Sequence, residues 1–207
     1  NVRSIIMGLI SNGTTIFDAG ALSAGLGFSM NFIKKLTASS SSSLGFTNGA
    51  SSVVLDSTYK EYLFIMNNLH FSDADCNVIA NITTGSNTLK TSSAFLATHG
   101  EDGSSGGAAY DTAGKDLAQS NNGQTIAINM GVENDECMCG TLSLFNPGST
   151  TFVKHYTAVT SYYQSANIAQ SYHIGGYCNT TSAITNVSFE ASAGTIDTGT
   201  ITMYGIA

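Results

Sequence analysis

Short apolar segments separated by turn residues fill the chain from residue 30 onward, and this pattern most constrains its fold. Within many segments apolar and polar residues alternate, which is typical of β-strands with one buried face. In QTIAINM, for example, Ile126, Ile128 and Met130 share a face. No segment shows a convincing amphipathic helix, and no fixed repeat suggests a propeller or solenoid. We expect strands within 30–37, 60–71, 76–83, 93–99, 124–130, 141–145, 151–159, 171–178, 182–190 and 199–205.

These strands predict an all-β fold: an antiparallel β-sandwich, jelly-roll-like, formed by residues 30–207 as a single domain. A chain of 207 residues is long enough to bury one substantial core of this kind. Asn48-Gly49 predicts a hairpin turn between two strands in 43–55. The glycine-rich stretch 101–123 is expected to be a long polar loop.

Residues 1–29 are predicted to form an extended N-terminal arm, because Gly20, Gly25 and Gly27 would each weaken a helix. A disordered terminus is the alternative. The polar residues 11–15 interrupt the first apolar stretch too early for a signal peptide. Met7 is a candidate translation start, which would make residues 1–6 an upstream extension. The apolar arm residues call for a covering surface, and we expect them to contact a neighbouring subunit: Ile5, Ile6, Leu9, Ile10, Ile16 and Phe17.

Charge is scarce in this chain, and its distribution excludes several classes of partner. Asp, Glu, Lys and Arg make up 10% of the residues, against about 25% in an average domain. The net charge is -7 and the basic residues are scattered, so no nucleic-acid partner is expected. No apolar run approaches the ~20 residues that cross a bilayer, so no membrane insertion is expected either. A neutral polar surface lets identical subunits meet without burying charges.

The cysteines and acidic residues give no clear metal or cofactor site. Unpaired thiols are expected, with one long-range disulfide as the alternative, because Cys-Met-Cys suits neither an ordinary disulfide nor a zinc site. The acidic turns 73–75 and 133–136 lack the spacing of a calcium-binding loop. We therefore predict no metal and no cofactor. The cysteines are Cys76, Cys137, Cys139 and Cys178.

No catalytic motif is present, and we expect a non-enzymatic protein. His99 beside Glu101 and Asp102 is the most enzyme-like stretch, because a histidine next to carboxylates can transfer protons. A polar loop accounts for the same residues. A polysaccharide depolymerase built on His99 and Asp102 is the enzymatic alternative.

Four tyrosines are candidates for binding a glycan. Aromatic rings can stack on sugars, although the chain lacks tryptophan, and the same rings could instead pack inside a sandwich or against a neighbour. The candidates are Tyr162, Tyr163, Tyr172 and Tyr177.

Several longer stretches together resemble a family of virion structural proteins of tailed bacteriophages, common among marine phages. The similar stretches span nearly the whole chain: MGLISNGTTIFDAGAL at 7–22, TASSSSSLGF at 37–46, VVLDSTYKEYLFIMNNLHFSD at 53–73, SSAFLATHGED at 92–102, LSLFNPGSTTFVKHY at 142–156 and the closing GGYCNTTSAITNVSFEASAGTIDTGTITMYGI at 175–206. The ending follows the pattern GTIxMYGI. One departure is that family members often carry a proline where this chain has 69–73.

The resemblance implies a jelly-roll-like virion subunit, usually a homotrimer, at the virion surface after assembly in the host cytoplasm. It carries no catalytic residues over to this chain. Because the chain has no heptads or collagen-like triplets to form a shaft, a capsid decoration protein or short fibre head is favoured over a long tail fibre. Its expected partners are itself and other virion proteins, such as major capsid or tail proteins. The alternative is a receptor-binding fibre tip that recognises host surface glycans.

Overall fold

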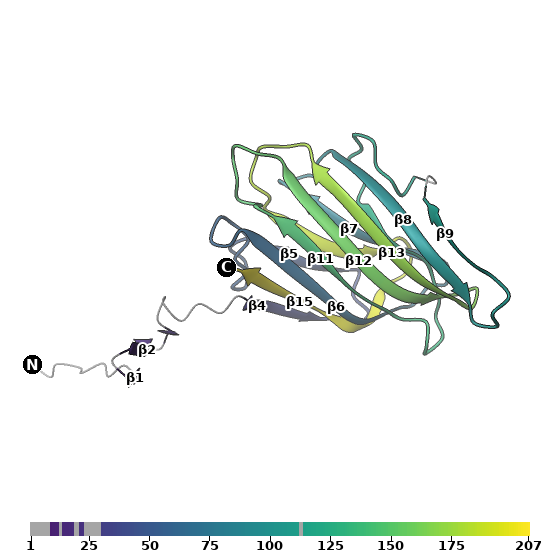
Figure 1. The fold of residues 1–207 in the computed structure, drawn as a ribbon, viewed down its shortest axis with the longest axis horizontal. Coiled ribbons are helices and arrows are strands. Elements are labelled where there is room, and N and C mark those ends of the chain that lie inside the picture. The colour runs from purple at the N-terminus through teal and green to yellow at the C-terminus, as the bar shows by residue number, and fades with distance from the viewer. Residues whose placement is uncertain (1–8, 13, 19–20, 23–29, 112–113) are drawn as a thin grey trace, which may run out of the picture.

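The structure, a computed structural model, describes residues 9–12, 14–18, 21–22, 30–111 and 114–207. Every regular element in these ranges is a β-strand, so the all-β prediction is confirmed (Figure 1). Among the described residues there is no helix long and apolar enough to span a membrane. The strands from residue 30 onward are β4 (Met30–Thr37), β5 (Ser43–Thr47), β6 (Glu61–Phe71), β7 (Cys76–Thr83), β8 (Lys90–Gly100), β9 (Gly106–Tyr110), β10 (Gln124–Met130), β11 (Met138–Phe145), β12 (Lys154–Gln164), β13 (Ile168–Cys178), β14 (Asn186–Ala191) and β15 (Ile196–Ile206).

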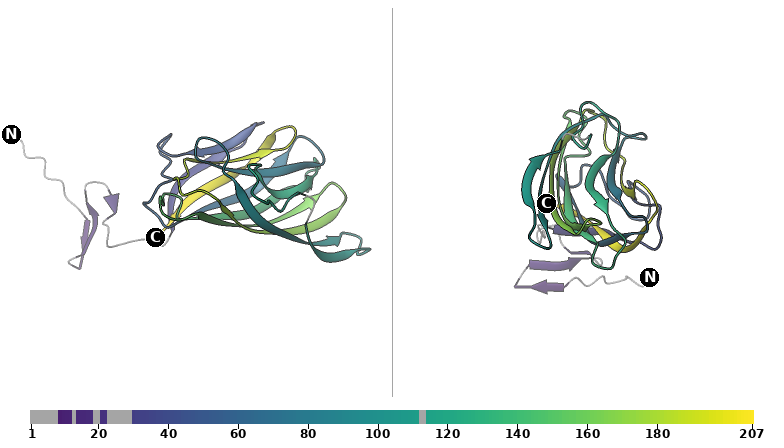
Figure 2. Two further views of the ribbon diagram at one scale, coloured as in Figure 1. Left: turned by 90° about the horizontal axis from the view of Figure 1, so that it is seen from above. Right: turned by 90° about the vertical axis from the view of Figure 1, so that its right-hand side faces the viewer.

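These strands form an antiparallel sheet that folds over itself into two layers, as in a jelly-roll-like sandwich. The large layer has the order β4-β15-β6-β11-β12-β13-β8-β9, and the small layer has the order β10-β7-β14-β5. A single residue pair, Met130 with Gln164, joins β10 to β12 and so connects the layers. Figure 2 shows the two curved layers facing each other. The predicted sandwich is therefore present.

Aromatic side chains fill the space between the layers. The Phe64 ring of β6 contacts Phe46 of β5 at 5.3 Å and Phe189 of β14 at 5.7 Å between ring centroids. Hydroxyl groups also cross the gap: Tyr156 of β12 donates a hydrogen bond to Gln124 Oε1 of β10 at 2.8 Å. All of these side chains are buried, so the core lies between the large and small layers.

Several strands lie where the hydrophobic pattern predicts them. The segments 30–37 and 76–83 coincide with β4 and β7. The longest apolar run becomes β6, a central strand between β15 and β11. In β15, Ile201 and Met203 are buried and Tyr204 is half-buried. The apolar segments and the turn residues between them therefore located these strands.

Two local predictions are wrong. Asn48-Gly49 does form a turn after β5, with Gly49 at φ 77°, but residues 53–55 that follow it form no strand. β5 pairs instead with β14, far along the chain. The stretch 101–123 is not wholly loop, because β9 forms in it and pairs with β8. β5 is decided by pairing with a strand far along the chain, and β9 by a hairpin with the preceding strand β8.

The described part of the N-terminal region forms a separate three-stranded sheet. Its strands are β1 (Leu9–Ser11), β2 (Thr14–Asp18) and β3 (Ala21–Leu22), in the order β1-β2-β3. Of the predicted contact residues, Leu9 and Ile10 are in β1, while Ile16 and Phe17 are in β2. Ile5 and Ile6 lie outside the described residues. The role of these six side chains stays a prediction.

Candidate binding surface

The outer face of the large layer carries a row of three exposed side chains and one half-buried side chain that crosses four strands. The strand register places Val159 of β12, His173 of β13, Phe95 of β8 and Tyr110 of β9 opposite one another in that order. The exposed fractions are 45% for Val159, 51% for Phe95 and 52% for Tyr110. The Phe95 and His173 rings stack, with 4.9 Å between centroids and 4° between planes. Contiguous exposed apolar groups of this kind mark surfaces that contact another molecule.

The same face lacks charged side chains over its central strands. Residues of β8, β12 and β13 alternate between buried and solvent-facing positions, which identifies the outward set. Over the described length of these strands, none of the outward residues is Asp, Glu, Lys or Arg. A partner could therefore cover this surface, which we call the neutral face, without stripping water from a charge. Its residues are Thr91, Ser93, Phe95, Ala97, His99, His155, Thr157, Val159, Ser161, Tyr163, Ala169, Ser171, His173, Gly175 and Tyr177.

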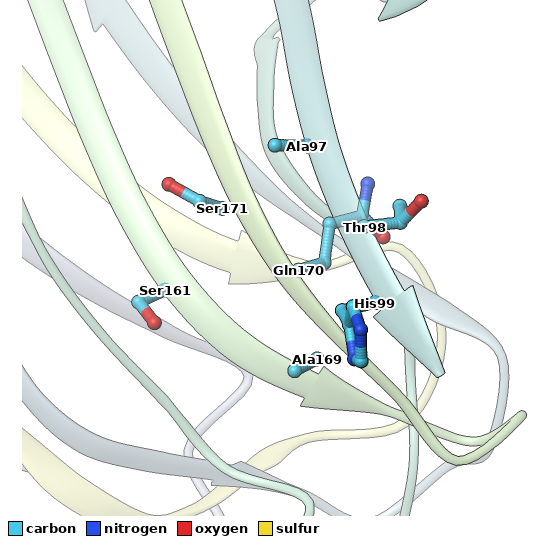
Figure 3. Close-up of a pocket in the computed structure, with 7 residues that line it drawn as sticks. All are labelled: Ala97, Thr98, His99, Ser161, Ala169, Gln170 and Ser171. Atoms are coloured by element: carbon cyan, nitrogen blue, oxygen red, sulfur yellow. The ribbon is translucent and has the colours of Figure 1, made fainter. Parts of the chain in front are cut away.

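A hollow of about 260 Å³ lies beside the apolar row. Three short side chains, Ser161, Ser171 and Ala97, lie opposite one another on β12, β13 and β8 and line it. The His99 ring stands at one end, next to Ala169 on the neighbouring strand (Figure 3). Short residues between longer ones produce a depression that can receive a side chain from a docking partner.

The two carboxylates that follow His99 accept hydrogen bonds from other residues. His99 is exposed on the neutral face. Asp102 lies in the turn between β8 and β9, where it accepts a hydrogen bond from the backbone N–H of Ser104 at 2.8 Å. Glu101 accepts a hydrogen bond from the Tyr163 hydroxyl. Both carboxylates therefore have hydrogen-bond partners, Asp102 within its own turn and Glu101 on β12.

Two of the four candidate tyrosines are buried, which corrects their assignment as sugar-stacking residues. Tyr162 is 4% exposed and Tyr172 is fully buried. The Tyr162 hydroxyl accepts a hydrogen bond from the Ile128 backbone at 3.1 Å, and the Tyr172 hydroxyl donates to Asp111 at 2.9 Å. Both rings pack in the core, so neither offers a face to a ligand.

The other two tyrosines lie on the neutral face and are half-buried. The hydrogen bond from Tyr163 to Glu101 raises the pKa of Tyr163 to about 12. The Tyr177 hydroxyl accepts a hydrogen bond from Gln119 at 3.2 Å, and its ring lies 5.9 Å from that of His155. They border the surface at opposite ends rather than forming one stacking platform.

The acidic turns hold local hydrogen bonds. Glu136 is buried, and its Oε2 accepts a hydrogen bond from the Glu133 backbone at 2.7 Å. Asp75 accepts one from the Ser165 hydroxyl. In the described part of the chain, no three His, Cys, Asp or Glu side chains come together as a metal-binding group.

Two lysines are buried beside a cysteine, which sequence reasoning missed. The register places Cys178 of β13 between Lys154 of β12 and Lys90 of β8, all fully buried. Both ammonium groups donate to backbone carbonyl oxygens, at 2.9–3.2 Å, in place of water. Burial lowers the pKa of both lysines and raises that of the Cys178 thiol. Lys154 alternates in phase with Tyr156 and could have been recognised as inward-facing from that spacing. All four cysteines are free, as predicted.

His70 of β6 and Asp197 of β15 form an ion pair at one end of the large layer. His70 Nδ1 lies 3.0 Å from both Asp197 carboxylate oxygens, and Nε2 lies 2.9 Å from the Glu133 carbonyl oxygen. Neither partner can donate, so both ring nitrogens donate and the protonated imidazole is favoured. Partial burial lowers the pKa of His70, but these hydrogen bonds and the Asp197 charge outweigh it and raise the pKa above its ordinary value.

This pair makes stability depend on pH in a defined direction. Because the folded pKa is raised, its contribution is complete below the unfolded pKa of about 6.5 and is lost as the pH rises through the folded pKa. We expect Asp197→Asn to cost up to about 1 kcal/mol at a pH of about 5.5 and less at about 8.5. Urea unfolding of both proteins at the two pH values measures this. A cost that stays constant or grows with pH would contradict the assignment.

No protein-family model and no curated protein matches this chain. Two solved structures, both from infectious bursal disease virus, show a weak likeness. One is the structure of the Gt strain, at 12% identity and a TM-score of 0.16, covering 98% of this chain and 47% of that one. The other is the VP2 subviral particle, at 14% identity and a TM-score of 0.15, covering 84% of this chain and 40% of that one. The chain spans less than half the length of these viral proteins, and a likeness this weak carries no argument about its function.

Proposed function

We propose that this chain is a non-enzymatic structural subunit of a bacteriophage virion, a capsid decoration protein or short fibre head at the virion surface. The observation that carries the proposal is the neutral face, with its exposed row of Val159, Phe95 and Tyr110. In this proposal the subunit is a homotrimer. Its N-terminal arm docks onto another virion protein, such as a major capsid or tail protein.

The sequence and the composition of this face both support this role. The sequence resembles virion structural proteins of tailed phages over most of its length. The sandwich has a large layer whose outward residues on β8, β12 and β13 are small, aromatic or hydroxylated. A stable interface buries about 800 Å² on each partner, and a sheet face without charges can be covered at little desolvation cost.

The experiment compares the oligomeric state of the wild type with that of a double variant, Phe95→Glu with Val159→Glu. We expect a trimer for the wild type by native mass spectrometry. We expect the trimer of the double variant to dissociate at a protein concentration more than about tenfold higher than the wild-type trimer does. The reason is that burying two carboxylates in the interface costs several kcal/mol. Both side chains are solvent-facing, so the fold should persist, as a thermal melt would confirm.

Phe152→Glu is the matched control, since Phe152 is also an exposed apolar residue but lies in the loop before β12. It should leave the trimer intact. A monomeric wild type, or a trimer that tolerates both glutamates, would contradict the proposed role of this face.

A further inference from the structure

A groove of about 580 Å³ crosses the outer face of the small layer. One wall is the segment 115–123, which leads into β10. Gly123 allows this segment to rest directly on β7: a Cβ at that position would lie 2.2 Å from Ile79 Cγ2 and 2.5 Å from Asn81 Oδ1. The volume is within the range of small-ligand sites.

Asparagine amides dominate the walls of this groove. Asn77 and Asn81 come from β7, Asn87 from the turn after it, and Asn121 and Asn122 from the opposite segment. Asn87 donates a hydrogen bond from Nδ2 to Asn81 Oδ1 at 2.9 Å, while its own Oδ1 is buried without a partner. Asn77 Oδ1 accepts a hydrogen bond from the Asn129 backbone at 3.4 Å. The groove therefore brings together amide groups from segments that are distant in sequence.

The groove contains few charged and few apolar side chains. Lys115 and Glu190 are its two charged residues, of opposite sign. On the floor, Ile79 of β7 lies opposite Thr125 of β10 on one side and Glu190 of β14 on the other. The floor thus has one aliphatic side chain bordered by polar groups.

This chemistry selects among ligand classes. A nucleic acid or polyanion needs several cations, and the groove has one. Calcium takes six to eight oxygen ligands, usually with several carboxylates, and the groove has a single carboxylate. Amides both donate and accept, as sugar hydroxyls do, and an aliphatic floor suits the C–H face of a sugar ring. We infer that the groove binds a short neutral oligosaccharide.

The test is isothermal titration of the full chain with four neutral trisaccharides: maltotriose, cellotriose, chitotriose and mannotriose. At least one should bind. The double variant Asn77→Ala with Asn121→Ala should weaken that binding about tenfold or more, as expected from the loss of two hydrogen bonds. Asn134→Ala is the matched control, because Asn134 is exposed in the loop between β10 and β11, outside the groove. It should leave the affinity unchanged.

Binding of none of the four sugars would overturn the inference, and so would binding that survives the double variant. Binding restricted to sialylated or sulfated glycans, tested in parallel, would overturn the neutral ligand class. The oligomeric state of the same samples separates this inference from the proposed function. If the protein is a trimer but binds none of the four sugars, only the inference about the groove is contradicted. If it is a monomer that binds one of them, only the proposed structural role is contradicted.

Discussion

Replacing Gly199 with alanine is expected to destabilise the protein by about 3 kcal/mol or more, the sum of left-handed backbone strain and overpacking. Gly199 opens the closing GTITMYGI and has φ 104°, a conformation that favours glycine. A Cβ there would lie 2.3 Å from the Asn68 carbonyl oxygen and 2.8 Å from Leu69 Cα, both backbone atoms of the paired strand β6. The backbone cannot yield without disturbing the β6–β15 pairing. Urea unfolding measures the loss.

Gly49→Ala is the matched control for this prediction. Gly49 also has a positive φ, 77°, but a Cβ there would meet no atom within 4 Å. Its cost should be limited to backbone strain, about 1 kcal/mol. If both substitutions lowered the free energy of unfolding equally, the close approach of β15 to β6 would not contribute to the cost at Gly199.

Phe64→Ala is expected to destabilise the protein by about 3–5 kcal/mol, as large-to-small changes at buried phenylalanines do. Phe64 is fully buried and packs with Phe46 and Phe189, so its ring joins the central strand of the large layer to two strands of the small one. Removing it leaves a cavity between the layers that β-strand backbones cannot close. Chemical denaturation with an unchanged m-value would report this loss.

Phe152→Ala provides the comparison, because the Phe152 side chain is exposed in a loop. We expect a change within about 0.5 kcal/mol for it. If Phe64→Ala cost no more than this, the layers would not be held together by the aromatic cluster.

Alternation predicted strand positions because it reports a local property, the difference between two faces of one strand. It worked for 141–145 and 199–205, which lie within β11 and β15. It missed β9, whose residues are all exposed, since Gly106–Tyr110 forms a strand only by pairing with β8. Asn48-Gly49 likewise predicted the turn but not the partner, because β5 pairs with β14 at a distance of well over a hundred residues.

In the candidate site, too, alternation predicts only part of the arrangement. Tyr162 and Tyr163 are adjacent in sequence yet face opposite sides of β12, one in the core and one on the neutral face. Alternation says that neighbours differ in direction, but it does not say which direction is buried. Only the position of the small layer over β12 settles that choice, and with it the loss of Tyr162 and Tyr172 as sugar-stacking candidates.

By itself, the sequence determined that this protein is all-β, where most of its strands lie, and that its surface is poor in charge. These properties depend on residue type and on a period of two along the chain. The tertiary structure decided which residues meet: the row of Val159, His173, Phe95 and Tyr110, and the asparagine-lined groove. Register and layer packing join segments that are far apart in the chain, and no local period encodes that choice.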